Sequence, residues 1–367
     1  VGGFRTGVEG SQDYDLLLRV TELTDRVYHI PRILYHWRII EGSTASGVGQ
    51  KNYAYLAGKK VLEDAVRRRG YHARVKLLEK ILCYNVEFYP VGEHLISIII
   101  PTKDKADVLQ RCLESIYKKT KTQNYEIIVV DNNSEEEATF QLFKKYEQKE
   151  NFRVLKQPIP FNYSRLNNEA ARIARGDLLL FLNNDVEVIT EDWLTLMAGE
   201  AERKEIGAVG VKLLYPDNTV QHAGVVLGIL GVAGHMGVGK DREDNGYMSH
   251  LATRRNYSAV TAACLMVRRE VFEEAGGFEE AIKVAFNDID FCMKVRELGY
   301  RNVFLADVLL YHYESLSRGL EDSPEKIARF NAEVSYMKKK WGEQLIQDPC
   351  YNCNFDLNTD KLQIKTS

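Results

Sequence analysis

Residues 177–187 read DLLLFLNNDVE, and this run indicates the class of the fold. The apolar residues between Asp177 and Asn183 are too many for a half-exposed strand and too few for most helices, so we expect a strand covered on both faces. The chain then turns polar, with Asn183, Asn184 and Asp185. Open α/β sheets bind ligands at this end of parallel strands, where an Asp can hold a divalent metal ion and, through it, a diphosphate. An ordinary turn is the alternative, because Asn and Asp are common turn residues.

The chain before this strand alternates between strand-like and helical patterns. We expect strands at 95–100, 126–130 and 152–155, and helices at 108–117, 136–146 and 164–174. Repeated β-α units predict an α/β fold, with a parallel, doubly wound sheet flanked by helices. No GxGxxG follows the first strand, and neither GxxxxGKS nor GxxxxGKT occurs in the sequence. This disfavours a nicotinamide dehydrogenase and a P-loop kinase.

Three of the expected strands end in polar clusters. These are PTKD at 101–104, DNNS at 131–134 and NND at 183–185. The carboxyl ends of parallel strands meet at the same edge of a sheet. We therefore expect the clusters to converge on one crevice, the place where such sheets bind nucleotides.

Composition and charge exclude several classes of protein. The 367 residues, 45% of them hydrophobic, allow two or three compact units with a substantial core. A formal charge of −3 gives no basic excess for a nucleic-acid surface, so no nucleic-acid partner is expected. The longest nearly apolar run, 223–234, is shorter than the roughly 20 residues of a membrane helix.

The six cysteines are scattered, which fits a reducing cytoplasm rather than a disulfide framework. Cys350 and Cys353 form a CxxC, but neither a second pair nor suitably spaced histidines follow to complete a zinc site. We expect a cytoplasmic protein and leave open a peripheral association with the inner face of the membrane. The sequence begins at Val1 without an initiator Met, so we also expect a longer native chain with further domains.

Three landmarks occur twice in the same order. The first set is GGF at 2–4, Asp13 and His36, and the second is GGF at 276–278, Asp288 and His312. The second Gly and the Asp are 10 residues apart in the first set and 11 in the second, and the Asp and the His are 23 and 24 apart. We interpret residues 1–46 as the closing part of a preceding domain whose complete sibling spans 95–345. No counterpart of Asp185 precedes Asp13, so the first copy is expected to be a catalytic remnant.

The remaining segments are a connector and a tail. Residues 51–82 lack strand alternation, and Ala54, Ala57, Val61 and Ala65 are at helical spacing, so 47–94 is predicted to be a helical connector. Residues 346–367 are predicted to form a C-terminal tail.

From Ile96 to about Leu345 the sequence resembles the inverting nucleotide-sugar glycosyltransferases of family 2, which have the GT-A fold. The matching segments are SIIIPT at 97–102, EIIVVDNNS at 126–134, NND at 183–185, GGF at 276–278 and NDID at 287–290. QHAG at 221–224 and NYSAVT at 256–261 resemble the bacterial surface-polysaccharide branch, whose members often have tandem domains.

The resemblance implies a divalent metal ion, manganese or magnesium, that stabilises the charge of the departing nucleoside diphosphate. Asp185 matches the metal-binding aspartate of the family, and His312 matches a histidine that can complete the metal shell. Asn183 and Asn184 are at positions where many relatives have acids, so the metal would have fewer carboxylate ligands. A buried histidine at a strand end is the alternative for His312.

Asp288 matches the catalytic aspartate, the general base that takes the proton from the acceptor hydroxyl. An N-cap role at the helix expected from 291 to 298 is the alternative. Asn287 and Asp290 are expected to orient the site or to cap this helix.

The resemblance also implies residues for the nucleotide and the sugars. The positions expected to hold the nucleotide are Thr102, Asp104, Asp131, Asn132, Asn162, Asn168 and Asn184. Asp131 is the best candidate for a base or ribose contact, although an Asp can also simply fix the turn after a strand. The candidates for sugar or acceptor contacts are His222, His235, Thr261, Asn287 and Asp290.

We therefore expect a metal-dependent inverting glycosyltransferase that moves a sugar from a UDP- or dTDP-sugar donor to a glycan or lipid-linked glycan of the cell surface. A non-catalytic nucleotide-sugar or glycan-binding module of a larger synthase is the second interpretation. A nucleotidyltransferase is the third, and it is disfavoured because the expected Gly-rich, Lys-bearing signature is missing from 95–110.

Overall fold

The computed structural model describes residues 1–36, 52–314, 323–359 and 361–365. They form two compact units, Val1–Val91 and Gly92–Ser367. Residues 37–46 of the predicted first copy lie outside the described residues.

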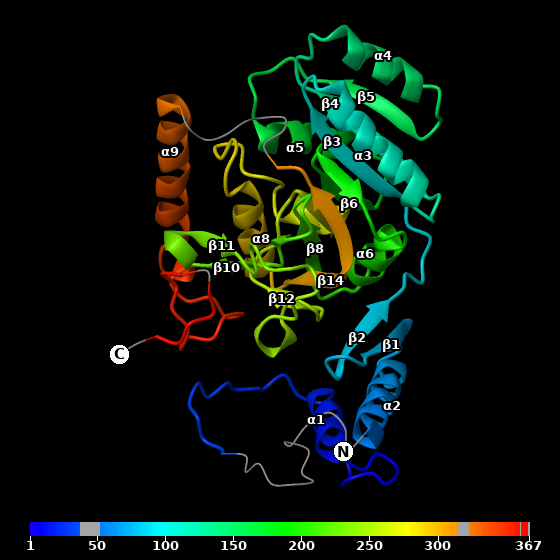
Figure 1. The fold of residues 1–367 in the computed structure, drawn as a ribbon, viewed down its shortest axis with the longest axis vertical. Helices are drawn as coiled ribbons and strands as arrows, with labels where there is room; N and C mark the ends of the chain where they lie inside the picture. Colours follow the sequence, from blue (N-terminus) through cyan, green and yellow to red (C-terminus); the bar gives the residue numbers. More distant parts are fainter. Residues whose placement is uncertain (37–51, 315–322, 360, 366–367) are drawn as a thin grey trace. The chain divides into compact units, whose positions relative to one another are not determined.

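One large sheet forms the centre of the second unit (Figure 1). Its strands are β3 (Ile96–Thr102), β4 (Tyr125–Asp131), β5 (Phe152–Lys156), β6 (Leu178–Leu182), β7 (Val186–Val188), β8 (Ile206–Leu214), β9 (Val220–His222), β12 (Arg255–Tyr257), β13 (Cys264–Arg268) and β14 (Arg301–His312). They lie in the order β12-β14-β8-β13-β6-β3-β4-β5, while β7 pairs with β14 and β9 pairs with β8. Strands β6, β3, β4 and β5 are parallel, as are β14 and β8, whereas β13 lies antiparallel between β6 and β8. The predicted α/β class is confirmed.

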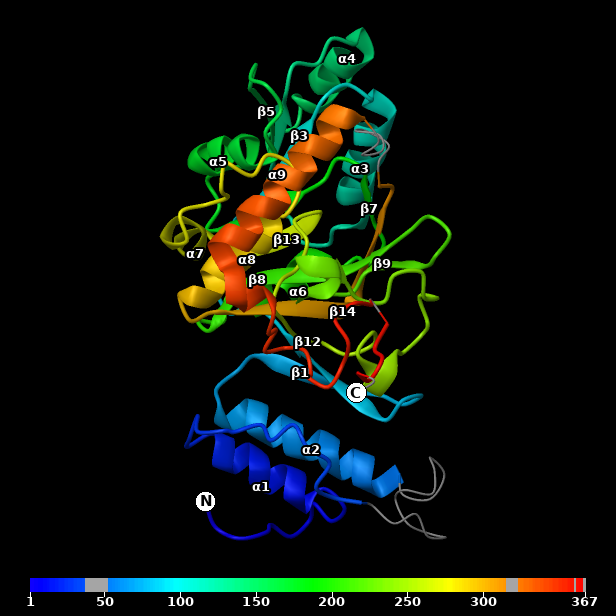
Figure 2. The same ribbon diagram turned by 90° about the vertical axis from the view of Figure 1, so that its left-hand side faces the viewer.

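Helices flank this sheet. They are α3 (Ala106–Lys119), α4 (Glu137–Tyr146), α5 (Tyr163–Ile173), α6 (Trp193–Ala201), α7 (Arg269–Glu274), α8 (Asn287–Glu297) and α9 (Pro324–Trp341), with short 3-10 turns η2 (Ile229–Gly231), η3 (Tyr247–Ser249) and η4 (Gly342–Leu345). Figure 2 looks onto α9, which runs beside α8. A separate hairpin pairs β10 (Val225–Leu227) with β11 (Ala233–His235). The β-α units predicted between 95 and 182 are confirmed, with shifts of one or two residues at their ends.

Strand β6 is covered on both faces, as its sequence predicts. All five of its side chains are buried, and the Phe181 ring centroid lies 5.0 Å from that of Phe272 and 4.7 Å from that of Phe278. The core therefore extends across β6, and the sequence turns polar at Asn183 while Asn184 and Asp185 remain buried.

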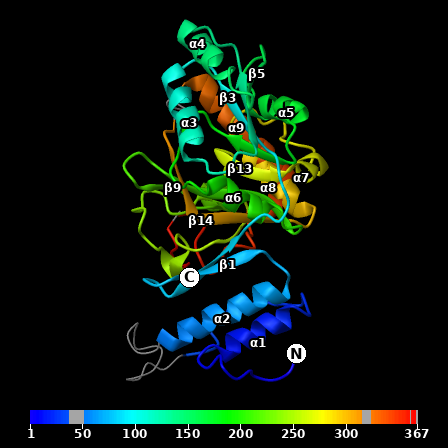
Figure 3. The ribbon, with the colours of Figure 1, turned by 90° about the vertical axis from the view of Figure 1, so that its right-hand side faces the viewer.

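The first unit contains α1 (Gln12–Thr21), α2 (Asn52–Arg68) and a hairpin of β1 (Ala73–Leu78) and β2 (Cys83–Phe88) (Figure 3). The helix predicted within the connector 47–94 is confirmed for Asn52–Arg68, and the helical prediction is wrong for β1 and β2. Gly70 has a φ of +70°, which favours glycine and ends the helix. In β1, Val75 is buried between exposed Arg74 and Lys76, an alternation typical of a half-buried strand.

The segment predicted as a C-terminal tail belongs to the second unit. Asp348 is buried; its Oδ2 accepts a hydrogen bond from the Leu227 N–H at 2.7 Å, and its Oδ1 accepts one from Ser258 Oγ at 2.6 Å. These bonds join the segment to the core. Cys350 and Cys353 are free and exposed. None of the helices in the described parts of the chain is long and apolar enough to cross a membrane.

Candidate active site

A cavity of about 590 Å³ lies at the carboxyl ends of β3, β4 and β6, where the polar clusters are predicted to meet. It is lined by Pro101, Thr102, Lys103, Asn132, Asn133, Ile159, Pro160, Phe161, Tyr163, Leu166, Asn183, Asn184, Asp185, His312 and Glu314. The strands thus bring together five of the predicted site residues, namely Thr102, Asn132, Asn184, Asp185 and His312.

The wall formed by β3 and β4 is held by side-chain amides. Asn184 Nδ2 donates to Thr102 Oγ1 at 2.9 Å. Asn132 Nδ2 donates to the carbonyls of Gln157 and Ile159 at 3.0 and 2.7 Å. These bonds fix the rim of the cavity before any ligand binds.

Asp131 lies at the end of β4 and is 5% exposed. Its Oδ1 accepts the Ser134 N–H at 3.1 Å, so the carboxylate fixes the turn after the strand. Asp104, with a φ of +53°, accepts the N–H groups of Glu135 and Glu136 at 2.7 and 2.8 Å. Neither Asp is among the residues that line the cavity.

Asn162 and Asn168 hold the loop that contains Phe278. Asn162 caps α5 by accepting the Arg165 N–H, and it donates to the Glu280 carbonyl at 2.8 Å. Asn168 accepts the Phe278 N–H and donates to the Phe278 carbonyl, both at 2.9 Å. The described contacts of both side chains are with protein groups, and neither residue lines the cavity.

Asp185 and His312 meet at one edge of the cavity because β7 pairs with the end of β14, which places His312 opposite Val186. Both residues are buried, at 5% and 8% exposed. His312 Nε2 lies 3.1 Å from Asp185 Oδ1, and the Tyr313 N–H donates to the Asp185 carbonyl at 2.9 Å. The pair predicted to bind metal is therefore in place.

The hydrogen bonds of His312 fix which of its nitrogens holds a proton. Gln221 Oε1 lies 2.6 Å from His312 Nδ1. The other end of the same amide sets its orientation, because Gln221 Nε2 donates to Glu314 Oε2 at 3.2 Å. An amide oxygen only accepts, so Nδ1 is protonated and the neutral ring has a lone pair on Nε2. Asn183 Nδ2 lies 3.2 Å from that nitrogen, so this amide and a cation would compete for the single lone pair of Nε2.

Two lone pairs therefore face each other, on His312 Nε2 and Asp185 Oδ1. Asp185 Oδ1 is buried and has no hydrogen-bond donor among the described residues. A cation between the two atoms would satisfy both, and imidazole with carboxylate is a suitable donor set for manganese or magnesium. No group of three or more His, Cys, Asp or Glu side chains in the described part of the chain could hold a metal. The pair thus fits a cation whose other ligands come from a diphosphate and water.

Asp288 lies in the first turn of α8 and is not the N-cap, which is Phe286. The N-cap alternative is therefore wrong. Asp288 Oδ1 accepts the Ile289 N–H at 2.8 Å, and Oδ2 accepts the Ala262 N–H at 3.0 Å. The Ala262 carbonyl accepts the hydroxyl of Tyr163 at 3.0 Å, and Tyr163 lines the cavity. Asp288 lies just outside the cavity lining, joined to it by these two bonds.

Asp290 and Asn287 have contacts within the protein. Asp290 is fully buried; its Oδ1 lies 2.7 Å from Lys340 Nζ and accepts a hydrogen bond from Trp341 Nε1 at 2.8 Å. Asn287 Nδ2 donates to the Val284 carbonyl at 3.1 Å, and its Oδ1 accepts the Asp288 N–H at 2.8 Å. Neither residue lines the cavity.

His222 is buried and His235 is half-buried, and their ring centroids lie 4.8 Å apart. Burial lowers the pKa of His222 well below its usual value, and the neighbouring His235 and His312 rings act in the same direction. Burial also lowers the pKa of His235, against the opposing effect of Asp288. Thr261 precedes Ala262, and its Oγ1 accepts the Ala263 N–H at 3.3 Å. None of these three candidates for sugar contacts lines the cavity.

Tyr163, Glu314 and Gln221 are among the residues of the site that sequence reasoning missed. Tyr163 and Glu314 line the cavity, and Gln221 fixes the tautomer of His312. Only Gln221 had a signal, because it lies in the QHAG stretch at 221–224.

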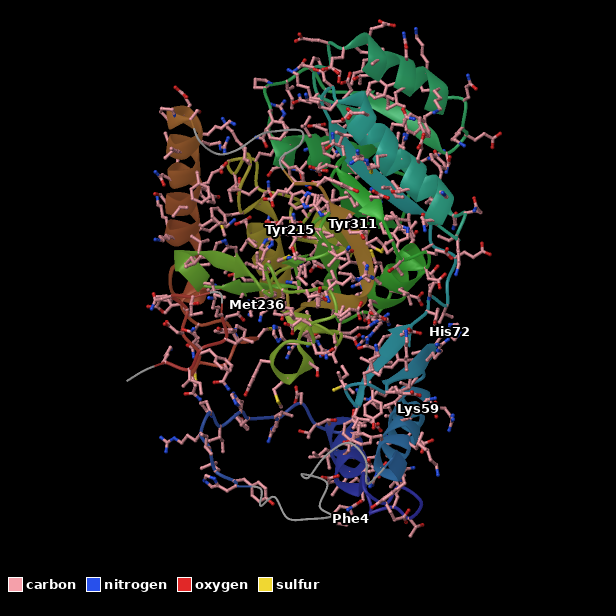
Figure 4. The ribbon with its side chains drawn as sticks, viewed as in Figure 1. Phe4, Lys59, His72, Tyr215, Met236 and Tyr311 are labelled. Carbon is pink, nitrogen blue, oxygen red and sulfur yellow. The ribbon has the colours of Figure 1, made fainter. Side chains whose placement is uncertain are left out.

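Figure 4 labels Tyr215 and Tyr311, which lie near the Glu314 end of β14. Their hydroxyl groups donate to Glu314 Oε2 at 3.4 Å and to Asn218 Oδ1 at 2.6 Å.

Comparison with known sequences assigns part of this chain to a family. Residues 97–276 match the sequence model of glycosyl transferase family 2. The chain is 48% identical over 362 residues to the uncharacterized protein y4gI of Sinorhizobium fredii, covering 97% of this chain and 40% of that protein. It is 41% identical over 332 residues to the O-antigen biosynthesis protein RfbC of Myxococcus xanthus, covering 89% of this chain and 25% of that protein. The chain thus spans less than half the length of either relative.

Two solved structures share the fold. A mannosyltransferase of Pyrobaculum calidifontis, in complex with GDP-Man and Mn²⁺, superposes with a TM-score of 0.51 at 16% identity, over 78% of this chain and 73% of that chain. GalNAc-T7 with UDP, GalNAc and Mn²⁺ superposes with a TM-score of 0.56 at 14% identity, over 69% and 50%. The family match and these folds together show that the chain contains a glycosyltransferase domain of family 2 with the GT-A fold.

Proposed function

We propose that the second unit transfers a sugar from a nucleoside-diphosphate donor, UDP- or dTDP-linked, to a growing cell-surface glycan, with inversion and with the help of a divalent cation. The observation that supports this best is the buried pair of Asp185 and His312, whose facing lone pairs lie at the edge of a nucleotide-sized cavity. The likeness to an O-antigen biosynthesis protein supports the choice of a surface glycan as acceptor.

In this proposal the cavity binds the donor, with the nucleoside against the wall of Thr102, Asn132 and Asn184 and the diphosphate near Asp185. The cation, manganese or magnesium, would be held by Asp185 and His312 and would stabilise the negative charge of the departing diphosphate. His312 ends β14 and Asp185 directly precedes its partner strand β7, so the two need little reorganisation to bind it.

Asp288 acts as the base in this proposal. As the acceptor oxygen bonds to the anomeric carbon, its proton passes to an oxygen of Asp288, and the bond from that carbon to the diphosphate breaks. The N–H groups of Ala262 and Ile289 orient the carboxylate. A single displacement of this kind inverts the configuration of the sugar.

The test measures the release of nucleoside diphosphate by the purified chain with Mn²⁺ or Mg²⁺, a panel of nucleotide sugars and a glycan acceptor. We expect Asp288→Asn to reduce release by a factor of about 10³ or more while donor binding stays within about twofold. Full turnover by Asp288→Asn would exclude this residue as the base. The exposed Asp217→Asn serves as the matched control.

One observation favours a second candidate, a non-catalytic module that binds nucleotide sugars or glycans. Both oxygens of Asp288 accept backbone N–H groups, and the residue is outside the cavity lining. This candidate predicts that a nucleotide sugar raises the melting temperature and that no donor of the panel is turned over.

We further propose that residues 1–46, of which the structure describes 1–36, are the closing part of another glycosyltransferase domain. Asp15 pairs with Arg19 at 2.8 Å, and Arg19 donates to the Gly3 carbonyl. In the second unit, Asp290 pairs with Lys294 at 3.8 Å, and Lys294 donates to the Gly277 carbonyl. The two sets of landmarks therefore share contacts as well as spacing.

The counterpart of β14 in the first unit is segment 27–36, which forms no strand there. Its exposed apolar side chains are Val27, Tyr28, Ile30, Ile33, Leu34 and Tyr35. The segment thus has the composition of a core strand without a sheet to pair with. If this copy is inactive in the present chain, Asp13→Asn and His36→Ala will leave diphosphate release within about twofold of wild type. A larger loss in either variant would assign the first unit a part in the reaction.

A further inference from the structure

The loop before α8 is held by a side chain from a distant helix. Glu333 of α9 accepts hydrogen bonds from three successive backbone N–H groups. Its Oε1 accepts those of Lys283 and Val284 at 2.8 and 3.0 Å, and its Oε2 accepts that of Ala285 at 3.0 Å. Glu333 is only 4% exposed, so these bonds are sheltered from water. Without the carboxylate, three neighbouring backbone donors would lose the side chain that binds them.

This loop leads directly to the proposed base. Phe286, a non-glycine residue with a φ of +63°, joins it to α8, and that conformation persists only where the surroundings hold it. On the far side of Phe286, Asn287 bonds to both the Val284 carbonyl and the Asp288 N–H, at 3.1 and 2.8 Å. The position of Asp288 is therefore connected to the loop that Glu333 holds.

The same loop also contacts the cavity wall. The Lys283 carbonyl accepts the Tyr163 N–H at 2.8 Å. The Tyr163 hydroxyl donates to the Ala262 carbonyl, and the Ala262 N–H donates to Asp288 Oδ2. A continuous series of hydrogen bonds thus connects loop 283–285, the cavity wall at Tyr163 and the carboxylate of Asp288.

Helix α9 has a second anchor beyond Asp288. Trp341 donates to Asp290 Oδ1 at 2.8 Å, and Lys340 lies 2.7 Å from the same oxygen. Glu333, Met337 and Trp341 are four residues apart in turn, and they are the buried residues of α9. One face of the helix therefore holds the chain on both sides of Asp288.

We propose that Glu333 is a positioning residue for the reaction: by binding the N–H groups of 283–285, it fixes the start of α8 so that Asp288 meets the acceptor hydroxyl. This inference rests on the proposed role of Asp288 as the base. Glu333 touches neither the cavity nor the reacting atoms. Its loss should therefore slow turnover without weakening donor binding.

The variants Glu333→Gln and Glu333→Ala remove different numbers of the three hydrogen bonds to 283–285. In Glu333→Gln the remaining oxygen can keep two of the bonds, while the new NH₂ faces the Ala285 N–H; in Glu333→Ala all three are lost. We expect kcat to fall by about tenfold in Glu333→Gln and about 100-fold in Glu333→Ala, with the donor KM within about twofold of wild type. Glu343→Gln, an exposed position beyond α9, is the matched control and should retain full kcat.

A second measurement does not depend on activity. Amide hydrogen exchange at 283–285 should accelerate by about tenfold or more in both variants of Glu333 and remain unchanged in Glu343→Gln. If Glu333→Ala does not fold, Glu333→Gln alone provides both measurements.

The outcomes distinguish this inference from the proposed function. Wild-type kcat in both Glu333 variants, with Asp288→Asn inactive, would overturn the positioning role and leave the function standing. A parallel loss of kcat and donor affinity would also overturn it, because general loosening of the fold would then be the cause. Failure of the wild-type chain to release diphosphate with every donor would refute the proposed function, and unchanged exchange at 283–285 would refute the contact itself.

Discussion

His312 Nε2 and Asp185 Oδ1 lie 3.1 Å apart, and both present lone pairs to the space between them when the ring is neutral. The reason is the contact on the other side of the ring, where Nδ1–H donates to Gln221 Oε1. A proton or a metal cation must lie between the two atoms for the contact to be favourable. The geometry of the pair is therefore a direct way to test the proposed cation.

Replacing Gln221 with Leu should weaken metal binding although Gln221 is not a proposed ligand. The substitution removes the acceptor that keeps the proton on His312 Nδ1, so the ring can rotate or place its proton on Nε2. Loss of such an outer partner typically reduces metal affinity by about 10- to 100-fold. Titration with Mn²⁺, followed by the electron paramagnetic resonance signal of the free ion, measures the change. Gln344→Leu, at an exposed position, is the control, and equal affinity in the two variants would contradict the tautomer argument.

Asp185→Asn should remove most of the affinity for the cation. Asp185 is the only carboxylate of the pair, and the neighbouring amides of Asn183 and Asn184 supply no charge. We expect Mn²⁺ binding to weaken by about 100-fold or more, because a buried anion is lost next to a dication. Calorimetry with Mn²⁺ and UDP, titrated separately and together, measures this loss. Undiminished metal affinity in the variant would mean that the cation is held elsewhere.

The local patterns of the sequence were enough to predict the centre of the sheet. The strands and helices between 95 and 182 follow from the alternation of apolar runs and helical periods, which depends on neighbouring residues only. The antiparallel insertion of β13 between β6 and β8 had no such signal. Pairing of this kind joins residues far apart in the chain, and five apolar residues look alike in either direction.

The candidate site, like the sheet, could be predicted from the sequence only in part. Asp185 and His312 were found together through the family resemblance, and the structure places them in contact. Asp104, Asn162 and Asn168 were assigned to the nucleotide, yet their side chains hold backbone groups. Short polar side chains after a strand or before a helix suit both tasks, so their type and spacing could not decide between them.

Stability should fall in mild acid because of His222. Burial lowers the pKa of this ring well below 6.5, so below about pH 6.5 the unfolded chain takes up a proton that the folded chain excludes. The free energy of unfolding is thus unaffected by this group above pH 6.5 and falls as the pH drops below it, by up to about 1.4 kcal/mol per pH unit. Urea unfolding at pH 7.5 and 5.5 measures the fall. His222→Gln should show a smaller difference between the two pH values, and an equal difference would show that His222 is protonated in the folded protein.

The shared contacts of Asp15 and Asp290 predict that the two residues stabilise the corresponding helices of the two units. Each carboxylate is fully buried and pairs with a basic residue one turn later, so its removal leaves a cation without its partner. We expect Asp15→Asn to accelerate amide exchange in α1, and Asp290→Asn to accelerate it in α8, each by about tenfold or more, which corresponds to about 1.4 kcal/mol. Asp13→Asn, two residues before Asp15 and exposed, should change neither helix by more than about twofold. Exchange measured by mass spectrometry at the same pH for all three variants is the test. If Asp15→Asn leaves α1 unchanged while Asp290→Asn loosens α8, the contact has a stabilising role in the second unit only, and the argument for a common origin from shared contacts fails.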